Sequence, residues 1–84
     1  MMHAVIKSAH DSLHLIGAVA PYNLESLAYH ATSMQRSAGP VDLSIWVTRD
    51  EEARLRREAK PLFDRLAHDG SAVHVCPTDS RRGL

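Results

Sequence analysis

The sequence contains a single cysteine and a single tryptophan, no excess of charge of either sign, and no apolar run long enough to cross a membrane. Because Cys76 has no partner for a disulfide within the chain, a disulfide-stapled secreted scaffold is excluded and a cytoplasmic location is expected. Ten Lys and Arg residues balance ten Asp and Glu residues. The chain therefore has no general attraction to nucleic acid or to an anionic membrane, and we expect neither partner.

What is present is the composition of one small globular domain. Of 84 residues, 44% are hydrophobic and 24% are charged, which is too apolar for a disordered chain. A chain of this length buries only about 60% of the surface of its unfolded form, which excludes a second domain or a large enclosed cavity. The residues from Pro77 onward show no periodicity, so we expect a single domain over residues 1–76 and a flexible tail over 77–84.

Four segments have the pattern of strands. Residues 3–9 and 13–19 are apolar runs separated by the turn formers His10-Asp11-Ser12, which predicts a hairpin. Residues 41–47 alternate strictly between apolar and other side chains, which predicts a third strand. A fourth is expected over 72–76, ended by Pro77.

Two segments have the spacing of helices. Apolar residues from Leu24 to Met34 recur at helical intervals, with Asn23 as the expected N-cap and Gly39-Pro40 as the stop. Thr48 and Glu51 have the spacing of a capping box, and a second helix is expected over 50–69. Pro61 lies inside this helix and predicts a kink or a break between residues 57 and 61.

The expected order is β-β-α-β-α-β, which predicts an α/β fold. Strands separated by helices should pair in parallel through right-handed crossovers, which places both helices on one face of a four-stranded mixed sheet, a two-layer sandwich. The alternation directs these residues toward the helices: Leu13, Leu15, Val41, Leu43, Ile45, Val47, Val73 and Val75. It directs these to the uncovered face: His14, Ile16, Asp42, Ser44, Trp46, Ala72, His74 and Cys76.

This pattern resembles the STAS domain, the fold of bacterial anti-sigma-factor antagonists and of transporter regulatory domains. The matching pieces are LHLIGAV, NLESLAYHA, VDLSIWV, DEEARL and AVHVC, over roughly residues 13 to 76. Antagonists of that family usually carry Asp-Ser-x-Gly or Asp-Ser-Ser-Gly at the start of the second helix, and a partner kinase phosphorylates the serine. Here Asp50 is followed by Glu51, Glu52 and Ala53, and the family's C-terminal helix is missing. The resemblance implies a regulatory domain that binds proteins, without that phosphorylation site.

Several side chains on the uncovered face could carry chemistry. His14, His74, Cys76 and Asp42 are residue types that zinc accepts, but no CxxC and no HxxxH on a helix accompanies them. Cys76 beside His74 could form a nucleophile and base, but no glycine-rich turn offers an oxyanion hole. We therefore expect no metal, no cofactor and no enzymatic activity.

The second helix carries as many acidic as basic residues, and most of them can pair along the helix. The pairs at i,i+4 spacing are Glu52 with Arg56, Arg54 with Glu58, and Lys60 with Asp64. This is the pattern of a solvated helix face, and it does not favour nucleic-acid binding. If the helix breaks near Pro61, its first half, with Arg54 and Arg57, is free to meet a partner.

Trp46 is the most informative residue, and two interpretations of it stay open. By alternation it points away from the helices, where Ile16 can join it, and exposed apolar groups in one patch mark a contact surface. If the register of the strand is shifted by one, Trp46 belongs to the core instead.

The sequence favours a small, non-catalytic regulatory or adaptor domain that binds another protein, or a second copy of itself through the uncovered face. The expected contact residues are Trp46, Ile16, His14, His74, Arg54 and Arg57. One alternative is a small inhibitor of the kind carried by phages and mobile elements, which blocks a larger complex. The other is a metal-binding or thiol-dependent protein that uses His74, Cys76, His14 and Asp42.

Overall fold

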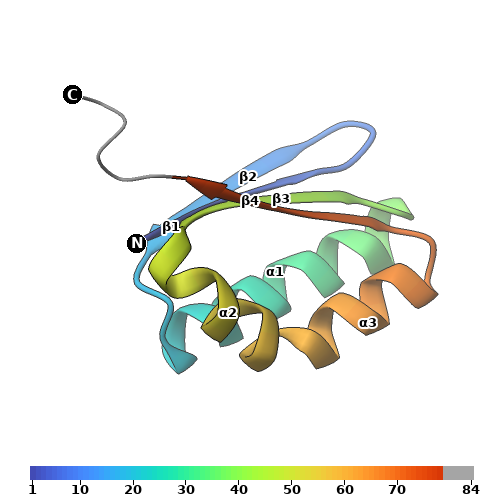
Figure 1. Ribbon diagram of the computed structural model, residues 1–84. Helices are drawn as coiled ribbons and strands as arrows, with labels where there is room; N and C mark the ends of the chain where they lie inside the picture. The colour runs from blue at the N-terminus through green and yellow to red at the C-terminus, as the bar shows by residue number, and fades with distance from the viewer. Residues whose placement is uncertain (79–84) are drawn as a thin grey trace.

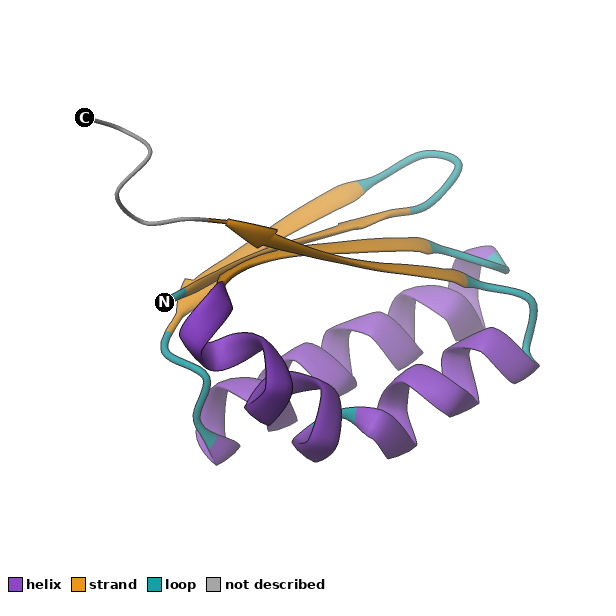
Figure 2. Cartoon of the chain, viewed as in Figure 1, coloured by secondary structure: helices purple, strands orange, loops and turns teal. Residues whose placement is uncertain are grey.

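Four strands and three helices follow one another along residues 1–78, the part of the chain that the computed structural model describes (Figure 1). The elements are β1 (Met2–Lys7), β2 (Ser12–Gly17), α1 (Pro21–Ala38), β3 (Asp42–Thr48), α2 (Arg49–Glu58), α3 (Lys60–His68) and β4 (Ala72–Thr78). The three helices all lie on one side of the sheet (Figure 2). The predicted two-layer α/β class is confirmed, with three helices in place of two.

The strands form one mixed sheet in the order β2-β1-β3-β4. β1 pairs antiparallel with both β2 and β3, and β3 pairs parallel with β4. The expectation that strands joined by a helix pair directly is therefore correct for β3 and β4 and wrong for β2 and β3. Those two run in the same direction, but the first strand of the hairpin lies between them.

The predicted break in the second helix is confirmed. α2 ends at Glu58, Ala59 joins the two segments, and α3 begins at Lys60. Pro61 lies in the first turn of α3, where a backbone N–H would have no helical partner and its absence costs little. The break therefore turns an unfavourable mid-helix proline into a favourable helix start.

The predicted N-cap of the first helix is wrong, and that of the second is correct in position only. α1 begins at Pro21 after the extended residue Ala20, because proline is well suited to the first position of a helix. Asn23 is already inside α1, and its side-chain amide donates to the carbonyl of Ala18 at 2.9 Å. Thr48 does precede α2, but its hydroxyl donates to the Glu51 carboxylate at 3.2 Å and makes no bond to a backbone amide.

The last strand is longer than predicted. β4 continues past Pro77 to Thr78, whose hydroxyl donates to the carbonyl of Val47 at 3.3 Å. Proline is tolerated there because β4 pairs on one side only, with β3. The strand end expected at residue 76 is therefore too early, and residues 79–84 of the expected tail lie outside the described residues.

The core lies between the sheet and the helices. On β3, Leu43, Ile45 and Val47 point toward the helices and are almost completely buried, as the alternation predicted. The cluster of buried residues is Met2, Ala4, Ile6, Val19, Leu27, Ala31, Val41, Leu43, Ile45, Val47, Leu55, Ala59 and Leu66. Each helix thus contributes at least one fully buried leucine, which fixes all three helices to the same face and leaves the other face free.

A buried serine aligns the starts of the two parallel strands. Ser71, immediately before β4, accepts a hydrogen bond from the backbone N–H of Val41 at 2.9 Å. Its hydroxyl donates to the side-chain oxygen of Gln35, whose amide nitrogen donates to Asp69 at 3.0 Å. Because Val41 directly precedes β3, this network connects the end of α1 to the beginnings of β3 and β4.

Candidate functional site

The sheet face opposite the helices is covered by no other element of residues 1–78 (Figure 2). We call it the open face. Its side chains are His3, Val5, Lys7, Ser12, His14, Ile16, Asp42, Ser44, Trp46, Ala72, His74 and Cys76. All eight residues predicted for the uncovered face are among them, so the predicted strand faces are confirmed.

The strand register arranges the open face in rows that cross all four strands. One row, in the order β2, β1, β3 and β4, consists of Ile16, His3, Trp46 and Cys76. The next consists of His14, Val5, Ser44 and His74. Neighbours within a row have their Cβ atoms about 5 Å apart, so each row is a line of side chains in contact range.

Trp46 and Ile16 are the large apolar groups of the first row. Trp46 has 40% of its surface exposed and Ile16 has 69%. The alternative in which Trp46 belongs to the core is therefore wrong, because the strand register is the one that strict alternation predicts. Exposed residues of this size on a central and an edge strand make this row the apolar part of the face.

His3 lies between these two residues and was not among the predicted contact residues. Its imidazole is 5.8 Å from Trp46 between ring centroids, and its Nε2 is 3.2 Å from Nδ1 of His14. The sequence did contain a signal for this pair of histidines. With residues 8–11 as the turn, the register of the hairpin makes His3 and His14 diagonal neighbours on one face. A turn position one residue off would separate them.

The β4 side of the open face holds a shallow hollow of about 180 Å³. Its lining residues are Val5, Lys7, Asp42, Ser44, Trp46 and His74. Nε2 of His74 is 3.8 Å from a carboxylate oxygen of Asp42, and both side chains are well exposed. The hollow thus has an apolar wall at Trp46 and polar groups opposite it.

The residues considered for a zinc or thiol site share the face but do not converge. His14 lies on β2 and His74 on β4, so three strand spacings of about 4.8 Å put them about 14 Å apart. Residues 1–78 contain no group of three or more His, Cys, Asp or Glu residues close enough to hold a metal ion. The four residues named in that alternative therefore do not form one site.

Arg54 and Arg57 lie in the helix layer, on the other side of the sheet from the open face. Nε of Arg54 is 2.9 Å from Glu58, and the other two predicted pairs of this segment also form, Arg56 with Glu52 at 2.9 Å and Lys60 with Asp64 at 2.8 Å. The six predicted contact residues consequently fall on two separate surfaces. Trp46, Ile16, His14 and His74 share the open face, and the two arginines do not.

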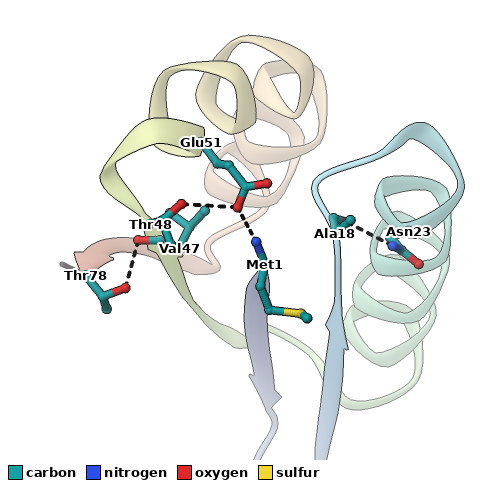
Figure 3. A network of polar contacts seen from close by, with 7 residues as sticks. All are labelled: Met1, Ala18, Asn23, Val47, Thr48, Glu51 and Thr78. Carbon is teal, nitrogen blue, oxygen red and sulfur yellow. Dashed lines mark hydrogen bonds and ion pairs between the residues drawn. The ribbon is translucent and has the colours of Figure 1, made fainter. Parts of the chain in front are cut away.

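The first turn of α2 corresponds to the place where the resembled family has its acceptor serine. Here this turn carries the carboxylate of Glu51, which is held by two hydrogen bonds. The α-amino group of Met1 and the hydroxyl of Thr48 both donate to Glu51 (Figure 3). The bond from the amino group, together with its positive charge, holds the pKa of Glu51 below its ordinary value, and burial opposes this only in part. Glu51 thus ties the beginning of β1 to the first turn of α2.

A second hollow, of about 630 Å³, lies in the helix layer. It is lined mainly by α1 and by the segment around the α2–α3 break, and includes Leu24, Ala28, Tyr29, Pro61, Leu62 and Arg65. The sequence analysis did not predict this hollow. Its only signal in the sequence was the pair of tyrosines on α1, Tyr22 and Tyr29, which are both strongly exposed.

Comparison with protein-family models, with curated proteins and with solved structures gave no match for this chain. The resemblance to the STAS domain thus stays a prediction from the residues. Among the helices of residues 1–78, none combines the length and the apolar character that crossing a membrane requires.

Proposed function

We propose that this chain is a small, non-catalytic regulatory domain that binds another protein through its open face. The observation that carries the proposal is the row in which Trp46 and Ile16 stand exposed on regular strands. Tryptophan is among the residues that contribute most to protein interfaces, because it buries a large area at low cost in conformational entropy. Presentation on a sheet lowers that cost further.

The size of the face indicates what kind of complex it can form. Four strands at about 4.8 Å spacing, with about six residues each at 3.3 Å, give a face of about 19 Å by 20 Å. Stable complexes bury about 800 Å² on each partner, which a face of this size provides only if its side chains are enclosed by a complementary surface. The open face therefore suits a transient, regulatory contact.

The polar groups of the face support recognition of a protein. Lys7 and Asp42 are cross-strand partners at the edge of the hollow, and His74 adjoins Asp42. The face thus combines an apolar row with charged groups of both signs two rows away, and protein interfaces likewise combine apolar and polar groups. A nucleic-acid surface would instead present predominantly basic groups.

The test compares two aromatic residues on opposite sides of the molecule. Trp46→Glu places a charge in the apolar row, and Tyr29→Glu places one in the helix layer, at a side chain that is 67% exposed. Wild type and both variants are examined by sedimentation velocity and by affinity capture from a lysate of the source organism. We expect self-association, or a specific captured protein, to be lost in Trp46→Glu and kept in Tyr29→Glu. Equal binding by both variants would contradict the proposal.

A further inference from the structure

We propose that His3 and His14 together bind one divalent transition-metal ion of the Zn²⁺ and Cu²⁺ class. The observation is the convergence of two imidazole nitrogens, His3 Nε2 and His14 Nδ1, which lie 3.2 Å apart on the open face. The inference does not depend on the proposed function, because it concerns the hairpin alone.

The separation of the two nitrogens fits a shared metal ion. Zinc binds imidazole nitrogen at about 2.0–2.1 Å, so two ligands at a tetrahedral angle are about 3.3–3.4 Å from each other. The observed 3.2 Å is within a small side-chain rotation of that value. The ring centroids are 5.4 Å apart with the planes tilted by 39°, so the rings meet at their nitrogen edges and do not stack.

In the free protein the two nitrogens face each other as donor and acceptor, so one of them carries a proton. An entering metal ion takes a lone pair from each of these two nitrogens, and the proton between them moves through solvent to the other nitrogen of its own ring. His3 then carries its proton on Nδ1 and His14 on Nε2. No electron is transferred, and the neutral pair keeps both of its ring protons.

The hairpin holds the pair in place before any ion binds. His3 lies on β1, which is bonded on both sides, and its ring is in contact range of Trp46. His14 is on the edge strand β2 and is exposed, so an ion can enter from solvent. Because the described residues supply two ligands, water completes the coordination. The ion is therefore exchangeable, unlike a structural zinc with four protein ligands.

The other histidine of the open face with a close polar neighbour lacks this geometry. His74 is 3.8 Å from an Asp42 oxygen, farther than the ligands of one zinc ion lie from each other, and the pair lies toward the opposite edge of the sheet, on β3 and β4. His74→Gln removes an exposed imidazole from the same face and leaves the pair intact. It is therefore the matched control for His3→Gln and His14→Gln.

The fluorescence of Trp46 reports binding, since bound Cu²⁺ would lie close to this single tryptophan and quench it. The Cu²⁺ titrations use full-length protein carrying Cys76→Ser, so that Cu²⁺ cannot oxidise the thiol, with Mg²⁺ as the negative control. They are repeated with Gly-Ser added before Met1, which moves the α-amino group away from His3. Zn²⁺ is titrated into the unaltered chain by calorimetry.

We expect saturable quenching at one Cu²⁺ per chain, and one Zn²⁺ bound per chain in the calorimeter. His3→Gln and His14→Gln should each weaken binding by about tenfold or more, because even outer-shell partners of metal ligands contribute tenfold. His74→Gln should bind as wild type does. Binding that survives His3→Gln and His14→Gln, or that His74→Gln weakens equally, would overturn the inference.

Proton NMR of the unaltered chain keeps the test independent of variant folding. Addition of Zn²⁺ should shift or broaden the imidazole resonances of His3 and His14 and leave those of His10 and His74 in place. Unchanged His3 and His14 resonances at millimolar Zn²⁺ would refute the site even if a variant failed to fold.

Discussion

His3 and Trp46 face each other directly across β1 and β3, with their ring centroids 5.8 Å apart and their planes tilted by 47°. This pair joins the two parts of the open face, the hairpin with its histidines and the parallel strands with their hollow. A change at either residue is therefore expected to alter the environment of the other. The fluorescence of Trp46 measures the effect of a change at His3.

Adjacent residues of β3 should differ sharply in their effect on stability. Ile45 is completely buried against the helices, so Ile45→Ala is expected to lower the free energy of unfolding by about 2–5 kcal/mol. Trp46→Ala, on the open face, should cost clearly less. Urea titrations followed by circular dichroism measure both, and a larger loss for Trp46→Ala would show that the two faces are assigned the wrong way round.

Removal of the Ser71 hydroxyl should destabilise the domain. In Ser71→Ala the N–H of Val41 loses its acceptor in a buried position, which costs about 1–3 kcal/mol. Ser12→Ala removes an exposed hydroxyl on an edge strand and is the control, with little expected change. Thermal unfolding of the two variants compares them, and equal melting temperatures would mean that Ser71 does not align the strands.

The Glu51 carboxylate should contribute to stability at neutral pH but not in acid. Its pKa is lower in the folded chain than the ordinary 4.5, so its contribution is complete above that value and is lost as the pH falls through the lowered pKa. Glu51→Gln is therefore expected to be less stable than wild type at pH 7, with a difference that shrinks below pH 4.5. Glu25→Gln, an exposed change on α1, serves as the control in urea unfolding across this pH range.

Charge reversal at Arg54 or Arg57 should leave binding at the open face unchanged. Both residues lie in the helix layer, and Arg54 is already paired with Glu58. Arg54→Glu places two like charges four residues apart and is expected to cost only a few tenths of a kcal/mol. A partner that is lost with these variants and kept by Trp46→Glu would place its binding surface on the helices.

The faces of the strands could be predicted from the sequence because alternation is a local property. Strict alternation over residues 41–47 was sufficient to assign the environments of Ile45 and Trp46. Pro61 likewise predicted the helix break, because a proline is favourable at only a few positions of a helix. These inferences needed no information about distant parts of the chain.

The position of β1 and the pairing of His3 could not be predicted in the same way. Nothing in residues 2–7 says whether β1 or β2 lies next to β3, because both are short and apolar on one side. The start of α1 was misplaced, and the bond of Thr48 was not foreseen, because Asn23 and Thr48 have side chains that can bond locally in several ways. Here they bond to Ala18 and to Glu51. Which bond forms depends on the tertiary environment.

The interior position of β1 has a consequence for the route by which the chain folds. Its pairing with β2 closes only a short turn, whereas its pairing with β3 must close a loop that contains the whole of α1. Closing a loop of this length lowers the entropy of the chain before the contacts between β1 and β3 can stabilise it. The docking of β3 on the preformed hairpin is therefore expected to limit the folding rate. Substitutions at the β1–β3 seam, such as Ala4→Gly, should then slow refolding, while those in β4 mainly accelerate unfolding.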